Sequence, residues 1–163
     1  MSEELFNEWK NGAINKKSEN RKFLKSLKKK DRKEIDGLAE DINEEVFEDI
    51  DCLKCANCCK TISPIVRNAD VRRMASHLKM KESKLIEEYL LIDEDEDFVM
   101  NSAPCPFLGS DNYCSIYEAR PKACREYPHI NHKPFTSINN LHKVNSLTCP
   151  AVYHALERMK KLI

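Results

Sequence analysis

Glycine is scarce in this sequence, with three residues in 163. A phosphate-binding loop of the glycine-rich kind places several glycines at fixed spacing, and no such motif is present. The sequence also lacks a nucleophile elbow and the C-x3-C-x2-C motif of radical enzymes. It therefore contains no motif of these enzyme classes.

Long apolar segments are absent as well. No apolar run approaches the roughly 20 residues that span a bilayer. The first residues, Met1–Leu5, lack the basic start and apolar region of a signal peptide. We therefore expect a cytoplasmic protein that does not bind a membrane. In a reducing compartment, clustered cysteines are more often metal ligands or redox-active thiols than disulfides.

Neither sign of charge is in excess, since Lys plus Arg and Asp plus Glu each number 27. A balanced net charge gives no argument for nucleic acid as the main partner. Charged residues make up 33% of the chain and aromatic residues 7%, so the apolar core of this single small domain should be thin. A metal that joins distant segments would add stability.

Cysteine, by contrast, is abundant, and four of the eight cysteines lie between residues 52 and 59. Two cysteines separated by two residues can turn both sulfurs toward one metal ion. Cys52, Cys55 and Cys58 form two overlapping pairs of this kind, a spacing with which ferredoxins hold three corners of an iron–sulfur cluster. Because adjacent side chains usually point in different directions, we expect Cys58 and Cys59 not to be equivalent ligands of one ion, so that one can serve a second site.

Residues 1–50 contain no cysteine and have the apolar spacing of amphipathic helices. Their charges are segregated: residues 16–33 hold ten basic and two acidic residues, and residues 34–51 hold nine acidic and no basic residues. Two helices folded antiparallel could pair the two signs. We interpret this segment as a helical scaffold and not as a nucleic-acid surface.

Short helices and strands are expected after the cluster. Asp70 is suited to cap a helix, and a second short helix should follow it. Residues 91–92 and 98–100 have the composition of two short strands. The turn residues Gly109–Asn112 predict a second hairpin.

Three of the remaining cysteines lie in turn or helix-start settings. The hairpin at Gly109–Asn112 would bring Cys105 and Cys114 face to face. Pro121 is suited to begin the helix that carries Cys124, and Pro150 to begin the last helix of the chain.

Three segments together resemble the YkgJ-type cysteine-cluster family, also known as the zinc- or iron-chelating CxxCxxCC domain. They are Cys52-x-x-Cys55-x-x-Cys58-Cys59, Cys105-Pro106-Phe107-Leu108, and Cys114–Pro128. The resemblance covers roughly residues 50–150, and Cys149 resembles the last cysteine of the family. The resemblance implies a cytoplasmic protein that holds zinc or iron through thiolates. Iron could be bound as an ion or as an iron–sulfur cluster. Flagellin lysine methylases contain a similar region, which raises methyl transfer to a protein as an alternative activity.

All eight cysteines are therefore candidate metal ligands: Cys52, Cys55, Cys58, Cys59, Cys105, Cys114, Cys124 and Cys149. Eight thiolates equal two four-sulfur sites, but one cluster with spare cysteines and a binuclear site with bridging thiolates are also open. Arg120, Arg125 and Tyr117 are candidates to surround the site, the arginines by offsetting thiolate charge. No catalytic residue is identified.

These patterns predict a mostly helical α+β fold with a short β-hairpin, nucleated by a cysteine-ligated metal centre. Residues 1–50 are the expected helical scaffold and residues 51–163 the metal-binding domain. We expect iron or an iron–sulfur cluster, with zinc as the alternative, in electron transfer or redox sensing. The alternatives are a protein-modifying enzyme related to the methylases and a structural zinc module that binds a protein. The partner would be a protein that the sequence does not identify.

Overall fold

The computed structural model describes residues 2–163, which form two compact units. The first unit joins the N-terminal part of the chain, through Cys55, to residues Pro128–Ile163. The second unit is the intervening segment Ala56–Tyr127. The expected domain division at residue 50 stays a prediction; the C-terminal residues pack with the N-terminal helices.

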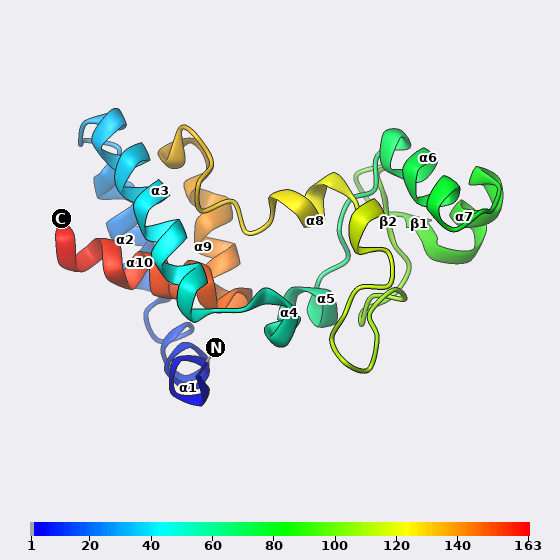
Figure 1. Ribbon diagram of the computed structural model, residues 1–163. Helices are drawn as coiled ribbons and strands as arrows, with labels where there is room; N and C mark the ends of the chain where they lie inside the picture. Colours follow the sequence, from blue (N-terminus) through cyan, green and yellow to red (C-terminus); the bar gives the residue numbers. More distant parts are fainter. Residues whose placement is uncertain (1) are drawn as a thin grey trace. The chain divides into compact units, whose positions relative to one another are not determined.

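The first unit is entirely helical in the part of the chain that the structure describes (Figure 1). Its elements are α1 (Glu3–Gly12), α2 (Lys17–Leu27), α3 (Arg32–Asp49), α4 (Cys52–Cys55), the 3-10 helix η2 (Phe135–Ile138), α9 (Asn139–Thr148) and α10 (Pro150–Leu162). Helix α10 packs against α1, α3 and α9, and α2 packs against α9. The unit is thus a helical bundle around α10.

The core of the first unit follows from the apolar spacing of its helices. On α3 the residues Ile35, Ala39, Ile42 and Val46 recur at helical spacing and are all buried. Asp31 begins this helix by accepting hydrogen bonds from the backbone N–H groups of residues 33 and 34. Apolar burial of this kind is worth about 1.5–3 kcal/mol for each large side chain. The helical interpretation of this segment is confirmed for residues 2–50; residue 1 lies outside the described residues.

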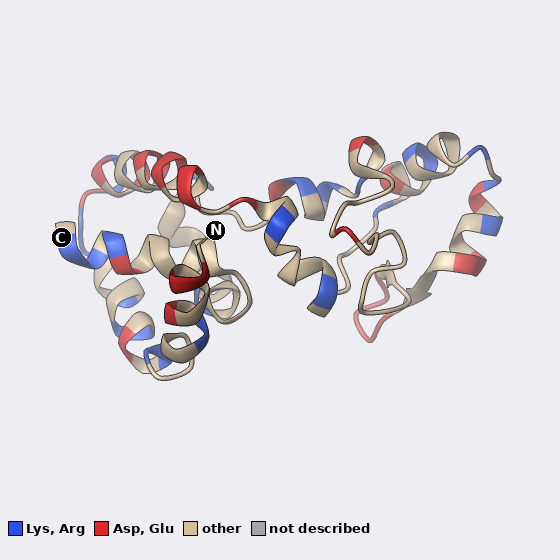
Figure 2. Cartoon of the chain, turned by 60° about the horizontal axis from the view of Figure 1, so that its bottom comes forward, with Lys and Arg blue, Asp and Glu red and all other residues tan. Residues whose placement is uncertain are grey.

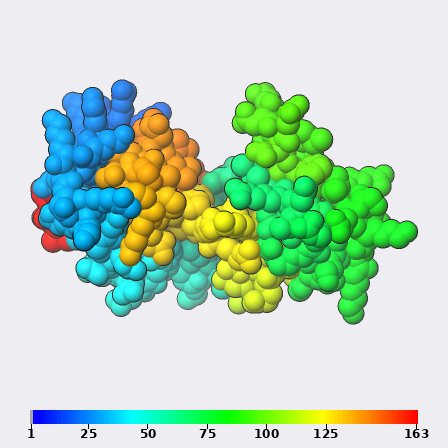
Figure 3. All heavy atoms as spheres, turned by 90° about the horizontal axis from the view of Figure 1, so that it is seen from above, coloured from blue at the N-terminus to red at the C-terminus, as the bar shows by residue number. Residues whose placement is uncertain are grey.

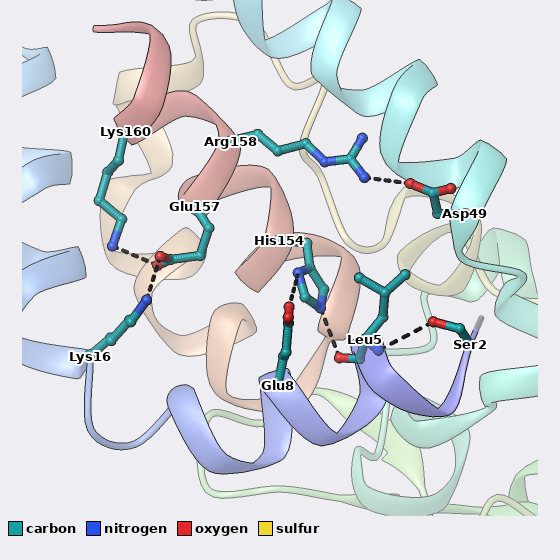
Figure 4. A network of polar contacts seen from close by, with 9 residues as sticks. All are labelled: Ser2, Leu5, Glu8, Lys16, Asp49, His154, Glu157, Arg158 and Lys160. Carbon is teal, nitrogen blue, oxygen red and sulfur yellow. Dashed lines mark hydrogen bonds and ion pairs between the residues drawn. The ribbon is translucent and has the colours of Figure 1, made fainter.

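The basic helix α2 and the acidic helix α3 could have paired their charges, but the structure shows other partners for α3. In residues 2–163 no salt bridge joins these two helices. The acidic side chains Glu45 and Asp49 of α3 instead bind Arg158 of α10 (Figure 4 shows the Asp49 contact). The reason is that the C-terminal helix, which local sequence patterns do not place, occupies the position beside α3.

The second unit combines short helices with a small sheet. Its elements are α5 (Asn57–Thr61), α6 (Asn68–His77), α7 (Glu82–Tyr89), β1 (Leu90–Ile92), β2 (Phe98–Met100), the 3-10 helix η1 (Tyr117–Ala119) and α8 (Lys122–Glu126). Strands β1 and β2 are antiparallel, with Leu91 opposite Val99. Ile65, outside the two strands, makes an isolated antiparallel bridge to Val99 of β2. The mostly helical α+β fold and its short hairpin are confirmed.

Asp70 joins two segments of the second unit, although it is not the cap that the sequence predicts. Helix α6 begins at Asn68, so that Asp70 lies in its first turn and accepts a hydrogen bond from the N–H of Arg67 at 3.0 Å. Its other oxygen accepts from Arg73 at 2.5 Å and from the N–H of Lys122, the first residue of α8, at 3.0 Å. The buried carboxylate therefore fixes the start of α8 to α6.

No helix in residues 2–163 is both long and apolar enough to cross a membrane.

Candidate metal centre

Four cysteines from separate segments of the second unit lie near one another. Cys59 is on α5, Cys105 follows β2, Cys114 precedes η1, and Cys124 is on α8. The N–H of Cys105 donates to the carbonyl of Cys59 at 2.8 Å, which fixes these two segments together. Cys114 makes an isolated antiparallel bridge with Leu108, so a tight turn returns the chain from Cys105 to Cys114. The expected second hairpin is thus present as a single bridge and its flanking turn.

The four thiols influence one another's pKa through their charges. Burial is the main cause that raises the pKa of Cys124 to about 12, and the charges of Cys59, Cys105 and Cys114 contribute to this value. Burial likewise raises the pKa of Cys105 and of Cys114, to which Cys59 adds in each case. Four thiolates gathered here would repel one another, and a cation among them would offset that repulsion.

Backbone N–H groups donate hydrogen bonds to the sulfurs of three cysteines, Cys105, Cys114 and Cys149. The N–H of Phe107 donates to the sulfur of Cys105, and the N–H of Ile116 to that of Cys114. The N–H groups of Ala151 and Val152, at the start of α10, donate to Cys149. Donation from a backbone N–H two residues further along is the arrangement found at cysteine knuckles that hold metals, because it stabilises the thiolate.

Cys58 and Cys59 point in similar directions. Their sulfur atoms lie 4.0 Å apart. Thiolates that share a tetrahedral zinc ion, with Zn–S near 2.3 Å, lie about 3.8 Å apart. The expectation that these adjacent side chains diverge is therefore wrong: the helical turn of α5 brings the two sulfurs together.

Cys59 is the thiol of this group that ionises most easily. A hydrogen bond from Cys58 lowers its pKa, burial opposes this, and the charge of Lys60 contributes to the final value of about 7. Sequence reasoning missed Lys60, although a cation directly after two adjacent cysteines was a usable signal.

The first unit holds a second, smaller group of cysteines. Cys149 lies at the N-terminus of α10 and is 8% exposed. Burial is the main cause that raises its pKa to about 12, and the charges of Cys52 and Cys55, at the two ends of α4, contribute to this value. The eight cysteines are thus divided between the units within the motif itself, after Cys55.

The candidate surrounding residues differ in their relation to the thiols. The guanidinium of Arg120 stacks over the ring of Tyr117 at 3.7 Å, and its charge lowers the pKa of both Cys114 and Cys124. Arg125 is exposed on α8, and no contact between it and a thiol is seen in residues 2–163. Tyr117 therefore holds the cation that faces the thiols.

The thiol donor set suits zinc and iron, both of which bind cysteine sulfur. None of the eight cysteines, which all lie within residues 2–163, forms a disulfide, so no sulfur is occupied by a covalent crosslink. Within residues 2–163, however, no group of three or more Cys, His, Asp or Glu side chains is placed to hold a metal ion. Metal binding would therefore require the thiols of a group to move toward a common point.

Comparison with known proteins identifies the family of this chain. No curated protein and no solved structure matches it. The family model described as "CxxCxxCC: Putative zinc- or iron-chelating domain" matches residues 51–150, which is more than half of the chain and includes all eight cysteines. The chain belongs to the CxxCxxCC family of zinc- or iron-chelating domains.

Proposed function

We propose that this protein binds iron, as an ion or an iron–sulfur cluster, or zinc, through two separate sets of cysteine thiolates. The set in the second unit comprises Cys58, Cys59, Cys105, Cys114 and Cys124. The set in the first unit comprises Cys52, Cys55 and Cys149. The proposal depends chiefly on one observation: the thiols of Cys59, Cys105, Cys114 and Cys124 interact electrostatically although they come from four different segments.

The residues around the second-unit thiols support this assignment. Backbone N–H groups are directed at two of the sulfurs, and Arg120 provides a nearby positive charge. These groups stabilise thiolates, which are the ionised form that binds metals. A bound iron–sulfur cluster would supply one-electron transfer, whereas zinc would supply a fixed crosslink between the four segments.

The Cys52-x-x-Cys55-x-x-Cys58 spacing is, as a sequence pattern, typical of iron–sulfur ligation. Because the two sets divide this run after Cys55, the preference for a cluster depends on the motif and not on the geometry of either set. Electron transfer or redox sensing would then be the role of the protein, with another protein as the electron donor or acceptor. Zinc would instead make this a structural module, for which the balanced charge and thin apolar core give a physical reason, since the crosslink would stabilise the fold.

Two double variants test the two sets. Cys114→Ser with Cys124→Ser removes ligands of the second unit only, and Cys52→Ser with Cys149→Ser removes ligands of the first unit only. Each variant, purified without oxygen, should lose the metal of its own unit and keep the metal of the other. Loss of all metal from both variants would show one shared site and contradict the division into two sets, and full metal content in both would contradict cysteine ligation.

A further inference from the structure

A pocket in the first unit is lined mainly by cationic and amide side chains. It has a volume of about 300 Å³ and lies between α2 and α9. Its polar lining residues are Arg21, Lys25, Lys28, Asn139, Asn140 and Lys143. The space-filling view shows the blue N-terminal helices directly beside the orange segment that contains α9 (Figure 3). Pockets of this size accommodate small ligands.

Four positive charges face this pocket. Arg21, Lys25 and Lys28 lie on one face of α2, since they are separated by four and then three residues. Lys143 extends from α9. Within residues 2–163 none of these four cations takes part in a salt bridge. Their mutual repulsion is therefore not relieved by acidic side chains of the protein.

Three acidic residues of the neighbouring sequence segment, on α3, form ion pairs with residues outside α2. Figure 2 shows a helix with many acidic residues, coloured red, in the first unit, and the ion pairs of α3 are with residues outside α2. Glu45 and Asp49 bind Arg158, and Glu40 binds Lys133. The positive charge at the pocket is thus available to an external anion.

The N-terminus of α9 adds to the anion-binding character. Asn139 and Asn140 are the first two residues of this helix, and Ile138 before them has no side-chain group that could cap it. The positive end of a helix dipole favours a bound anion. Asn139 donates from its amide nitrogen to the carbonyl of Leu24 at 2.6 Å, and its amide oxygen is buried without a hydrogen-bond partner. The hydrogen bond to Leu24 fixes the side chain of Asn139 at the wall of the pocket, and the cations provide its charge.

We propose that this pocket binds a small anion with two or more phosphate groups, the chemistry shared by inorganic pyrophosphate and nucleoside diphosphates. Four cations match the charge of two adjacent phosphates. Their convergence on one pocket favours a compact ligand over an extended nucleic-acid strand, which is contacted along a groove. This proposal is independent of metal binding, because no cysteine lines the pocket.

The test is calorimetric titration of the full-length protein with pyrophosphate and, separately, with ADP, at about 50 mM salt where surface charges are weakly screened. Lys25→Gln with Lys28→Gln removes two lining charges. The matched control is Lys29→Gln with Lys30→Gln, which removes the same charge from exposed neighbours outside the pocket. The first pair should weaken binding of both ligands by about tenfold or more, and the control pair by less than about threefold.

The two ligands distinguish the sources of the phosphate. Equal affinity for pyrophosphate and ADP indicates that the phosphates alone are recognised. Tighter binding of ADP indicates a contribution from its sugar or base. Either result supports the proposed phosphate site. Three results would overturn it: no binding of either ligand up to about 1 mM, a weak limit for a specific site; equal weakening by the two variant pairs; or binding of a single-stranded oligonucleotide without binding of pyrophosphate or ADP.

Discussion

The sulfur atoms of Cys58 and Cys59 lie 4.0 Å apart, and the Cys58 thiol is the main cause that lowers the pKa of Cys59 to about 7. The neighbouring thiols of Cys105 and Cys114 are shifted in the opposite direction by burial. At neutral pH, before metal is bound, Cys59 is therefore more readily present as thiolate than Cys105 or Cys114. Since the thiolate is the form that ligates metals, we expect Cys59 to be the first ligand of this set to engage one.

Alkylation of the metal-free protein should reveal this order. With iodoacetamide at pH 7, Cys59 should react faster than Cys105 and Cys114. All three cysteines are partly buried, but burial raises the pKa of Cys105 and of Cys114, so less of each is present as the reactive thiolate. The rate for Cys59 should rise to a plateau above its pKa of about 7. Mass spectrometry of the digested protein gives the modified fraction of each cysteine over time.

The variant Cys58→Ala tests the role of the adjacent pair. Alanine removes the side-chain hydrogen bond that lowers the pKa of Cys59, so this pKa should rise toward its ordinary value and alkylation of Cys59 at pH 7 should slow by several-fold, on the order of the change in thiolate fraction. Unchanged kinetics at Cys59 in this variant, or equal rates for all three cysteines in the natural protein, would be inconsistent with the proposed role of the adjacent pair.

Asp70 should be required for the stability of the second unit. Its carboxylate is 2% exposed and accepts hydrogen bonds from Arg67, Arg73 and Lys122. Asp70→Ala leaves these donors unpaired and should lower the free energy of unfolding by about 3 kcal/mol. Because Lys122 is two residues from Cys124, the variant should also hold less metal in the second unit.

Urea unfolding and metal analysis measure both effects. Glu87→Gln, on the exposed surface of α7, serves as the control and should change stability by less than about 0.5 kcal/mol. A stability loss for Asp70→Ala as small as that of the control would show that the buried carboxylate does not join α6 to α8.

Two glycines in helices should respond oppositely to substitution by alanine. A Cβ atom at Gly12 would lie 2.8 Å from the Cζ atom of Tyr153, whereas a Cβ at Gly37 would meet nothing within 4 Å. Gly12→Ala must displace the buried ring of Tyr153 and should destabilise the protein by about 1–3 kcal/mol. Gly37→Ala, inside α3, should stabilise it by about 0.5–1 kcal/mol. Thermal unfolding of the two variants checks both signs, and a rise in stability for Gly12→Ala would contradict the packing of α1 on α10.

Glu157 should make the stability of the first unit dependent on acid pH. Burial tends to raise its pKa, but hydrogen bonds from Lys16 and Lys160 outweigh this and lower the pKa below its ordinary value of 4.5 (Figure 4). A carboxyl group whose pKa is lower in the folded state stabilises the fold above the unfolded pKa and loses that contribution as the pH falls through the folded value. Glu157→Gln should therefore cost about 1 kcal/mol at pH 7 and progressively less below about pH 4.5.

Chemical unfolding of the natural protein and the variant from pH 7 to pH 3 measures this difference. Glu48→Gln is a matched control, because Glu48 is exposed on α3 and forms no salt bridge in the described part of the chain. The stability difference for Glu48→Gln should be small at every pH. A constant difference for Glu157→Gln across this range would rule out the ionisation of Glu157 as its cause.

Local patterns in the sequence predicted much of the secondary structure. The apolar spacing of Ile35, Ala39, Ile42 and Val46 predicted α3, and Pro150 marked the start of α10. Helix α9 was missed because its polar residues and short length give little apolar periodicity, and its position is set by packing against α2 and α10. The return of the C-terminal residues to the N-terminal helices is likewise a tertiary effect that local patterns do not contain.

The candidate site was predictable in its residue types and not in its geometry. Cysteine spacing identified the thiols, and the family match covers all of them. The electrostatic interaction of Cys149 with Cys52 and Cys55 depends on where α4 and α10 begin. The proximity of Cys58 to Cys59 depends on the helical turn of α5, which cysteine spacing alone does not define. The unneutralised charge of α2 could not be predicted either, since it depends on where α10 packs.

Metal and acid-labile sulfide content, with a visible absorption spectrum, of the protein purified without oxygen tests the central claim most directly. We predict bound iron with sulfide and a broad absorption band near about 400 nm, as thiolate-ligated clusters give. Stoichiometric zinc without colour would replace the cluster by a structural metal and retain cysteine ligation. Protein that contains neither metal, and takes up neither when iron and sulfide or zinc are supplied, would contradict the account.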